Sequence, residues 1–323
     1  MIKKIKKYFT KKAFKNGFKI LSGTLDGFLD DKGLKLSASL AYYTVFSLAP
    51  LLLLLISVAG AIYGRDAINN TIFGEINGLV GNDAAKQIQD MIKNVSLSGK
   101  TTSAVVIGAI TLLLGATSVF GEIQDSINII WKVKAKPKRG WVKLIQDRLL
   151  SSSLIVGLGF LLIVSLVVNG MVEALSGILT RILPDITVIF IQIINIAISF
   201  VVITILFGVI FKILPDVKIA WKDVRAGALF TAVLFMIGRF LIGLYISTTG
   251  TGSTYGAAGS LIVILVWVYY TAAILYFGAE FTQTYAEYKG LKIAPADYAV
   301  HVQQTEVEKD VAVLPPQGNT DKK

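Results

Sequence analysis

Few side chains in this 323-residue chain could carry out acid–base or metal chemistry. There is no cysteine and only one histidine, His301, close to the C-terminal end. A zinc phosphodiesterase needs several histidines and acidic residues around its metal ions, and a Ser–His–acid triad needs a histidine within the fold. The sequence therefore predicts a protein that is not an enzyme, holds no metal ion and needs no cofactor, and it argues specifically against a ribonuclease.

Nucleotide-driven chemistry is also not indicated. The phosphate-binding pattern G-x-x-x-x-G-K-[ST] does not occur in the chain. The glycine-rich stretch TGTGSTYG, residues 249–256, has no lysine after it and is better explained as a turn between two apolar segments.

The remaining candidates are polar side chains inside long apolar segments. An amide or a charge in hydrocarbon is costly unless it is bonded, so these groups are expected to face protein or water and to form a substrate path. The candidates are Tyr43, Ser47, Glu173, Gln192, Asn195, Ser199, Arg239 and Glu280. Small and polar stripes of this kind also arise from close helix packing alone. For Arg239 the alternatives are a side chain that reaches outward to the interface and one that pairs with Glu173 or with an anionic ligand.

The elements that must position these residues are membrane helices. The chain is 54% hydrophobic and 16% charged, whereas roughly a quarter of the residues in a soluble protein are charged. Apolar runs of about 22 residues match the thickness of a bilayer at 1.5 Å per helical residue. The sequence predicts an all-α, polytopic bundle of six transmembrane helices, at residues 38–62, 103–119, 149–172, 186–211, 224–246 and 258–280.

Three further segments flank these spans. Residues 1–37 alternate lysines with apolar residues and are predicted to form a basic amphipathic helix at the membrane interface, either as an anchor or as a lipid sensor. Residues 63–102 are predicted to form outer amphipathic helices, either as caps or as a substrate lid. The domain of residues 38–288 is followed by a tail, 289–323, that is predicted to be disordered and cytoplasmic.

The basic residues give the orientation. The formal net charge is +11, and Lys and Arg concentrate in the two ends of the chain and in residues 120–148 and 212–225. Only Arg65, Lys86, Lys93, Lys100 and Arg181 fall on the opposite side. By the positive-inside rule both termini are cytoplasmic, and the basic loops are expected to meet anionic lipid headgroups rather than nucleic acid.

Five segments resemble the bacterial YihY/BrkB inner-membrane family, once labelled ribonuclease BN. They are SLAYYTVFSLAPLLLLLISVAG, GATSVFGEIQDSINIIW, RGWVKLIQDRLLS, ILPDVKIAWKDVRAGALF and STYGAAGSLIVILVWVYYTAAILYFGAEFTQTYA. The resemblance covers about residues 15–288. It implies six helices in the inner membrane with cytoplasmic ends. Some members of the family have been connected with lipid A or phospholipid traffic, and no family-wide reaction is settled.

The family motif carries over onto a defined set of residues. At the position of Arg239 the family more often has lysine or another polar residue. The matching residues are Tyr42, Tyr43, Pro50, Asn128, Trp131, Asp147, Arg148, Pro215, Asp216, Trp221, Asp223, Tyr255, Gly256, Gly259, Trp267, Tyr270, Gly278 and Glu280.

Two main functions remain open. The first is movement of an anionic amphipathic substrate, such as a phospholipid or a lipid A precursor, with Arg239 holding the headgroup in the outer leaflet and basic residues such as Lys138 and Arg139 holding it inside. The second is a non-catalytic scaffold that binds envelope proteins; an unrecognised membrane enzyme is a weaker third. A lateral opening near Arg239, lined by Gln192 or Asn195, favours lipid handling, whereas a sealed bundle favours a scaffold.

Overall fold

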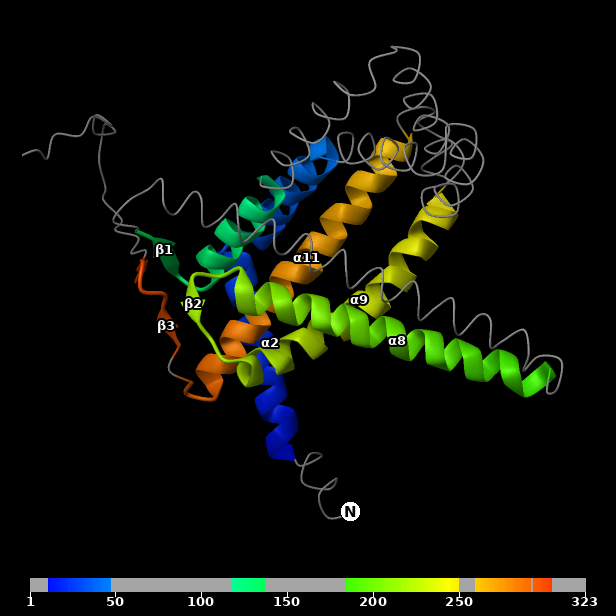
Figure 1. The fold of residues 1–323 in the computed structure, drawn as a ribbon, viewed down its shortest axis with the longest axis horizontal. Coiled ribbons are helices and arrows are strands. Elements are labelled where there is room, and N and C mark those ends of the chain that lie inside the picture. Colours follow the sequence, from blue (N-terminus) through cyan, green and yellow to red (C-terminus); the bar gives the residue numbers. More distant parts are fainter. Residues whose placement is uncertain (1–10, 48–117, 137–183, 250–258, 292, 304–323) are drawn as a thin grey trace, which may run out of the picture.

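The structure, a computed structural model, describes residues 11–47, 118–136, 184–249, 259–291 and 293–303. Helices make up most of this part of the chain (Figure 1). The elements are α2 (Lys11–Asp30), β1 (Val133–Ala135), α8 (Pro184–Ile213), β2 (Val217–Lys218), α9 (Trp221–Thr249), α11 (Gly259–Tyr288), β3 (Ala294–Pro295) and β4 (Ala299–His301). Residues 33–47 and 118–130 are also helical.

Three helices are long and apolar enough to cross a membrane. The stretches are Ile196–Ile213 in α8, Trp221–Ile242 in α9 and Ile264–Tyr288 in α11. They correspond to the last three predicted spans, which are thereby confirmed as membrane-length helices. The first three predicted spans lie wholly or largely outside the described residues, as does the outer excursion of residues 63–102. The count of six spans therefore stays a prediction.

The last helix continues beyond its predicted end. The sequence predicts that this span ends at residue 280, whereas α11 continues to Tyr288. Its true end is set by Gly290, which has a φ of 65°. The amide of Gly290 donates to the carbonyl of Glu287 at 2.8 Å, and the amide of Leu291 donates to that of Ala286 at 3.0 Å. This is a Schellman cap, which needs the left-handed conformation that glycine adopts without strain.

Helices α9 and α11 pack through two reciprocal glycine–threonine contacts. Thr231 of α9 donates to the carbonyl of Gly227, and Thr282 of α11 donates to that of Gly278, each at 2.7 Å. A Cβ added to Gly278 would overlap the Thr231 side chain, and one added to Gly227 would overlap that of Thr282. Small residues let the two backbones approach closely, as is common between membrane helices. Gly278 is thus a packing residue.

Helix α2 has two apolar faces. One packs against α11, where the Phe28 and Phe277 rings meet edge to face with centroids 5.6 Å apart. The other face is exposed and carries Phe18, Leu21, Leu25 and Leu29. The predicted N-terminal helix is therefore present, and it is joined to the bundle along one side. Its position at the membrane interface stays a prediction.

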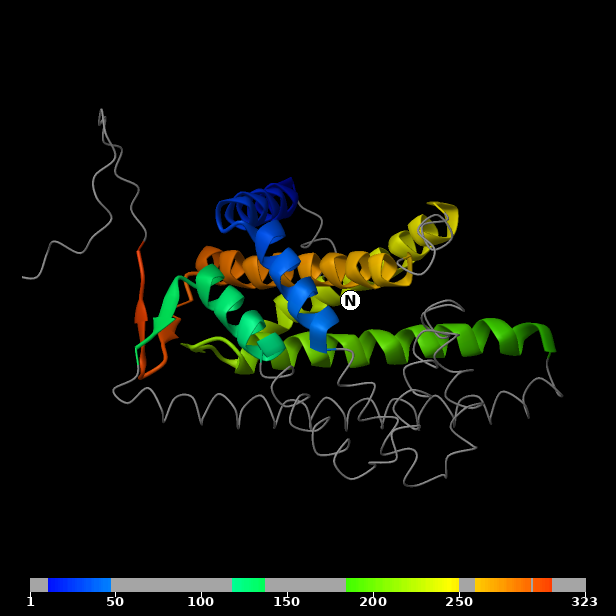
Figure 2. The ribbon, with the colours of Figure 1, turned by 90° about the horizontal axis from the view of Figure 1, so that it is seen from above.

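The segment after α11 is ordered and pairs with two distant parts of the chain. Strand β4 is antiparallel to β1, with Val133 opposite His301, and β3 is antiparallel to β2, with Val217 opposite Pro295. Figure 2 shows these strands together at one end of the helices. This corrects the predicted disorder for residues 294–301, because the backbone groups of this segment find partners in the loops of other elements. Residues 304–323 lie outside the described part.

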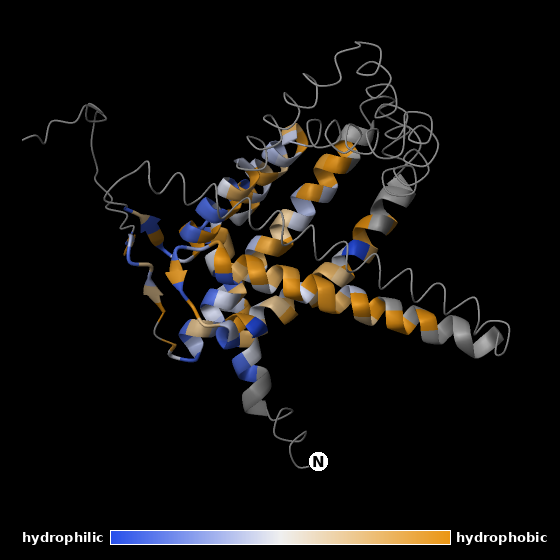
Figure 3. Ribbon diagram, viewed as in Figure 1, coloured by the Kyte–Doolittle hydropathy of each residue, from blue (hydrophilic) through white to orange (hydrophobic). Residues whose placement is uncertain are grey.

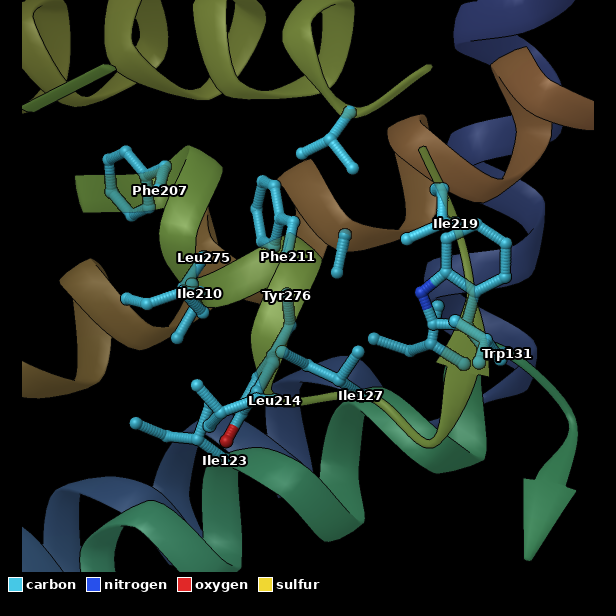
Figure 4. Close-up of a cluster of buried hydrophobic side chains, with 14 of the residues drawn as sticks. Ile123, Ile127, Trp131, Phe207, Ile210, Phe211, Leu214, Ile219, Leu275 and Tyr276 are labelled. Atoms are coloured by element: carbon cyan, nitrogen blue, oxygen red, sulfur yellow. The ribbon is translucent and has the colours of Figure 1, made fainter. Parts of the chain in front are cut away.

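The buried core is concentrated at the same end of the helices. Figure 4 shows Ile127, Phe211 and Tyr276 converging there from the 118–130 helix, α8 and α11, and each is at most 1% exposed. Farther along α8 and α9 many apolar side chains are exposed, and Figure 3 shows that hydrophobic residues predominate along these parts of the two helices. Large exposed side chains there include Ile193, Ile196, Val201, Ile205, Val233, Ile237, Phe240, Leu241 and Leu244. A helix that is apolar on all sides is typical of a membrane span.

Candidate functional site

A buried carboxylate, Asp216, connects the core to the end of the bundle. It lies between α8 and β2 and is 2% exposed. Gln124 and Asn128 sit one turn apart on the 118–130 helix, so both amides reach the same side. The Gln124 Nε2 donates to Oδ1 at 3.0 Å, and the Asn128 Nδ2 donates to Oδ2 at 2.9 Å. The backbone amide of Asp216 donates in return to the Asn128 Oδ1 at 2.8 Å.

The same aspartate holds the C-terminal segment. The hydroxyl of Tyr298 donates to its Oδ1 at 3.0 Å, and the amide of Ala296 donates to its backbone carbonyl at 2.9 Å. A buried carboxylate is stable when several donors satisfy its oxygens. Asp216 therefore acts as a fixed acceptor that joins the 118–130 helix, the α8–α9 connection and the C-terminal strands. Its geometry suits a structural role better than contact with a substrate.

A second buried carboxylate, Glu280, lies where α2 meets α11. Its residue is 3% exposed, and the backbone of α2 covers it at Gly27, where an added Cβ would overlap the carboxyl group. The Oε2 atom has no hydrogen-bond partner among the described residues. Asp31 and Lys132 lie close enough to act on this carboxyl electrostatically. Among the predicted path residues whose side chains the structure describes, Glu280 alone lies in such a closed polar junction.

An open apolar groove runs between α9 and α11. It has a volume of about 340 Å³, and none of its lining residues is charged. It lies within the membrane-length parts of both helices, and α2 reaches it through Phe28. The lining residues are Phe28, Leu234, Ile237, Leu241, Tyr270, Ala273, Ile274 and Phe277. The groove is therefore apolar, open and formed by two helices long enough to span a membrane.

Two further cavities lie beside the ribbon that the antiparallel strands β1 and β4 form, and both are more polar than the groove. The first, about 480 Å³, is lined by Trp131, Val217, Glu287 and His301 among others. The second, about 470 Å³, includes Asp31, Asp125 and Lys134 in its lining. Lys132 contributes to both. Neither cavity combines enough ligating groups for a metal ion, and within the described residues no cluster of three or more acidic residues or histidines could hold one.

None of the predicted path residues whose side chains the structure describes lines the groove between α9 and α11. Arg239 is exposed on α9. Tyr43 is 40% exposed, and the Ser47 hydroxyl donates to the carbonyl of Thr44 at 2.8 Å. Ser199 is half-buried on α8. Gln192 and Asn195 belong to α8, but the structure does not describe their side chains. Glu173 lies outside the described residues. A continuous path through these residues stays a prediction.

The motif residues divide into those with a visible contact and those without. Asn128 and Asp216 bind each other, and Trp131 is buried in the core. Trp221 is 53% exposed at the start of α9, and Tyr270 packs where Gly238 of α9 comes close to α11. Tyr42 is exposed and lies against Phe46. The motif residues Pro50, Asp147, Arg148, Tyr255 and Gly256 are outside the described part.

Sequence reasoning missed five residues of the two carboxylate sites: Gln124, Tyr298, Gly27, Asp31 and Lys132. One signal was available, because Gln124 and Asn128 put two amides on one helical face among buried isoleucines. The others lie far from their partners in the sequence, and nothing in their local pattern indicates the contact.

Comparison with known proteins gives one family. A family model described as "Virulence factor BrkB" matches residues 24–299. A UPF0761 membrane protein of Tolumonas auensis is 27% identical over 273 residues, covering 79% of this chain and 81% of the relative. UPF0761 membrane protein RC1_0578 of Rhodospirillum centenum is 26% identical over 280 residues, covering 82% of this chain and 57% of the relative. No solved structure matches the chain.

Other relatives are also longer than the part they share with this chain. UPF0761 membrane protein PSPA7_4558 of Pseudomonas paraeruginosa is 26% identical over 272 residues, covering 82% of this chain and 62% of the relative. The chain thus spans less than two thirds of the length of several of these relatives. The names of these relatives describe membrane proteins and say nothing of a substrate or a partner.

Proposed function

The chain belongs to the virulence factor BrkB family of multi-pass membrane proteins, and on that premise we propose that it moves or shelters an anionic amphipathic lipid in the bacterial inner membrane. A phospholipid or a lipid A precursor is the substrate class. The observation that carries the proposal is the apolar groove between α9 and α11. A soluble substrate would need polar groups in such a place, whereas an acyl chain needs none.

The groove suits an acyl chain because it is apolar and open. A lipid tail could enter it from the bilayer without crossing a polar layer, and the tail would exchange one apolar surrounding for another. The free-energy cost of entry is therefore low, which suits a substrate that must also leave. Ala273 is the smallest lining residue, so a larger side chain there would occupy the space.

The basic end of the bundle suits the headgroup. Helix α2 contributes Phe28 to the groove and carries exposed lysines, including Lys15 and Lys19. Lys32 in the turn after α2 and Lys35 in the helix of residues 33–47 are also exposed. Each basic residue near an anionic leaflet contributes about 1 kcal/mol of attraction. The lysines of α2 lie in its N-terminal half, whereas Asp26 and Asp30 flank Phe28, so the anionic headgroup would bind toward the N-terminal half of the helix while the acyl chain occupies the groove.

Reconstitution in liposomes tests this function. Purified protein is inserted into vesicles that contain a fluorescent anionic phospholipid, and its transbilayer movement is measured. Ala273→Trp should reduce the protein-dependent rate towards that of empty liposomes, because the indole fills the groove. Val233→Trp is the matched control, since Val233 is 46% exposed on α9 and is not among the residues that line the groove. Equal rates in wild-type and empty vesicles would reject the function for that lipid.

The scaffold is the second candidate, and one observation favours it. The reciprocal contacts of Gly227 with Thr282 and of Gly278 with Thr231 lock α9 to α11. Helices packed this closely make a rigid pair, which a scaffold needs more than a transporter does. The liposome measurement distinguishes a transporter from a scaffold. A scaffold moves no lipid on its own, so vesicles that contain it should show the lipid movement of empty vesicles, with or without Ala273→Trp.

A further inference from the structure

Glu280 is buried without the compensation that Asp216 has. Its residue is 3% exposed, Gly27 of α2 closes over it, and its Oε2 has no hydrogen-bond partner within the described part of the chain. A carboxylate in such a place loses its hydration, and within the described residues its Oε2 receives no hydrogen bond in return. An isolated buried charge is therefore unstable unless a positive charge or a proton reaches it.

The positive charge that acts on Glu280 in the described part of the chain is that of Lys132, and Lys132 is already paired with another carboxylate. Lys132 forms an ion pair with the Oδ1 of Asp31, whose side chain is 9% exposed. The Asp31 Oδ2 is also buried and without a partner in the described residues. The charged groups that act on Glu280 are Asp30 and Asp31 from α2, Lys132 from the start of β1, and Glu287 from its own helix. Three acidic groups and one lysine thus surround a fourth acid, so negative charge is in excess.

We propose that Glu280 is a proton-binding site, in which the carboxyl group takes up one proton and stays neutral while Gly27 of α2 is packed over it. A proton needs one oxygen, and the free Oε2 provides it. A metal ion would need several oxygen ligands, and the described residues contain no group of three acidic or histidine side chains that could provide them. The proposal does not require a lipid in the α9–α11 groove.

The proton has a mechanical consequence. The Gly27 backbone touches the carboxyl group, so loss of the proton would place a full charge directly beneath α2. Water must then reach the carboxylate, and α2 must move away from α11 to admit it. Binding and release of one proton would thus close and open the contact between the basic N-terminal helix and the last membrane helix.

Infrared difference spectroscopy of the full-length protein in liposomes tests the site. A protonated carboxyl group has a C=O stretching band that a carboxylate lacks. We expect wild-type protein to show such a band, Glu280→Gln to lose it, and Glu287→Gln to keep it. Glu287 is the matched control, because it is an exposed glutamate two turns farther along α11. An unchanged band in Glu280→Gln, or no band in the wild type, would overturn the proposal.

Thermal unfolding of the same variants provides an independent check. Glutamine has the shape of a neutral glutamic acid, so Glu280→Gln should fold and unfold at a temperature close to that of the wild type. Glu280→Lys should unfold at a lower temperature, because the longer lysine side chain has no room beneath Gly27. Failure of Glu280→Gln to fold would count against a neutral Glu280, since the amide copies that state.

Discussion

At the residue scale, the buried carboxyl groups of Asp216 and Glu280 differ in how the energetic cost of removing them from water is offset. Asp216 accepts hydrogen bonds from Gln124, Asn128 and Tyr298, and these donors stabilise its charge. Glu280 has the Gly27 backbone against it and one oxygen without a partner among the described residues. The hydrogen bonds hold Asp216 in a fixed position, whereas the stability of the Glu280 site depends on whether a proton is bound. The two groups therefore differ in what a substitution should do.

Replacing Asp216 should be far more damaging than replacing one of its donors. Asp216→Ala leaves two amides and a hydroxyl without their acceptor, which should cost about 3–5 kcal/mol of stability. Tyr298→Phe removes one hydrogen bond and should cost about 1 kcal/mol. The measurement is thermal or denaturant unfolding of the purified protein in detergent.

Asp297→Asn is the control for this pair. Asp297 is the neighbouring residue, and its ion pair with Lys218 is exposed, with an Asp297 side chain that is 88% accessible. Exposed ion pairs contribute about 0–1 kcal/mol, so this variant should behave like the wild type. Equal losses for Asp216→Ala and Tyr298→Phe would show that the aspartate does not hold several segments together.

At the element scale, the two strand pairs β1–β4 and β2–β3 form two-stranded ribbons that the surrounding helices stabilise. Strand β1 has three residues and β2 has two. A two-stranded ribbon this short has little stability of its own, so these pairs depend on the helices that present them. Lys132, with a φ of 53°, turns the chain from the 118–130 helix into β1. Val302 then donates to the Lys132 carbonyl at 2.8 Å and extends the pairing with β4.

Disulfide cross-linking should confirm the register of β1 and β4. The chain has no cysteine, so introduced pairs give an unambiguous result. Val133→Cys with His301→Cys should form a disulfide under mild oxidation, because these residues face each other in a non-hydrogen-bonded position of the ribbon. The readout is the changed mobility of the oxidised protein in a denaturing gel.

A pair shifted by two residues is the control for that experiment. Val133→Cys with Ala299→Cys places the cysteines diagonally across the ribbon, at a separation of about 7–8 Å. That separation exceeds the range a disulfide spans without movement of the backbone. Equal cross-linking of both pairs would mean that the C-terminal segment does not hold a fixed register.

At the scale of the whole molecule, the N-terminal helix and the C-terminal ribbons occupy the same end of the bundle. Helix α2 meets α11 where Gly23 approaches Thr284 and Gly27 approaches Glu280, close to the end of α11. The ribbons follow from that same end (Figure 1). Both described end segments should therefore lie on one side of the membrane, and the positive-inside rule predicts that this side is the cytoplasm.

Single-cysteine labelling tests this topology. Lys19→Cys and Asp297→Cys each introduce an exposed thiol near one end of the chain. In sealed inside-out vesicles a membrane-impermeant maleimide should label both, and in intact spheroplasts it should label neither. Labelling of the two sites from opposite sides would contradict both the predicted even number of spans and the packing of α2 on α11.

The sequence alone determined which described segments are membrane helices. Apolar runs of sufficient length predict α8, α9 and α11, because a backbone in lipid can satisfy its polar groups only within itself. It also predicted an N-terminal amphipathic helix and the motif residues Asn128 and Asp216. It did not predict that these two bind each other, that α11 extends to Tyr288 or that the segment after it is ordered.

Only the tertiary structure decided which distant residues meet. Tyr298 lies 82 positions from Asp216, and Lys132 lies 101 from Asp31. Hydrophobic periodicity reports the surroundings of a residue on its own helix and carries no information on which other segment packs there. Helix formation in a membrane is local and is fixed by composition, whereas the pairing of a buried carboxylate with its donors is fixed by the packing of whole elements.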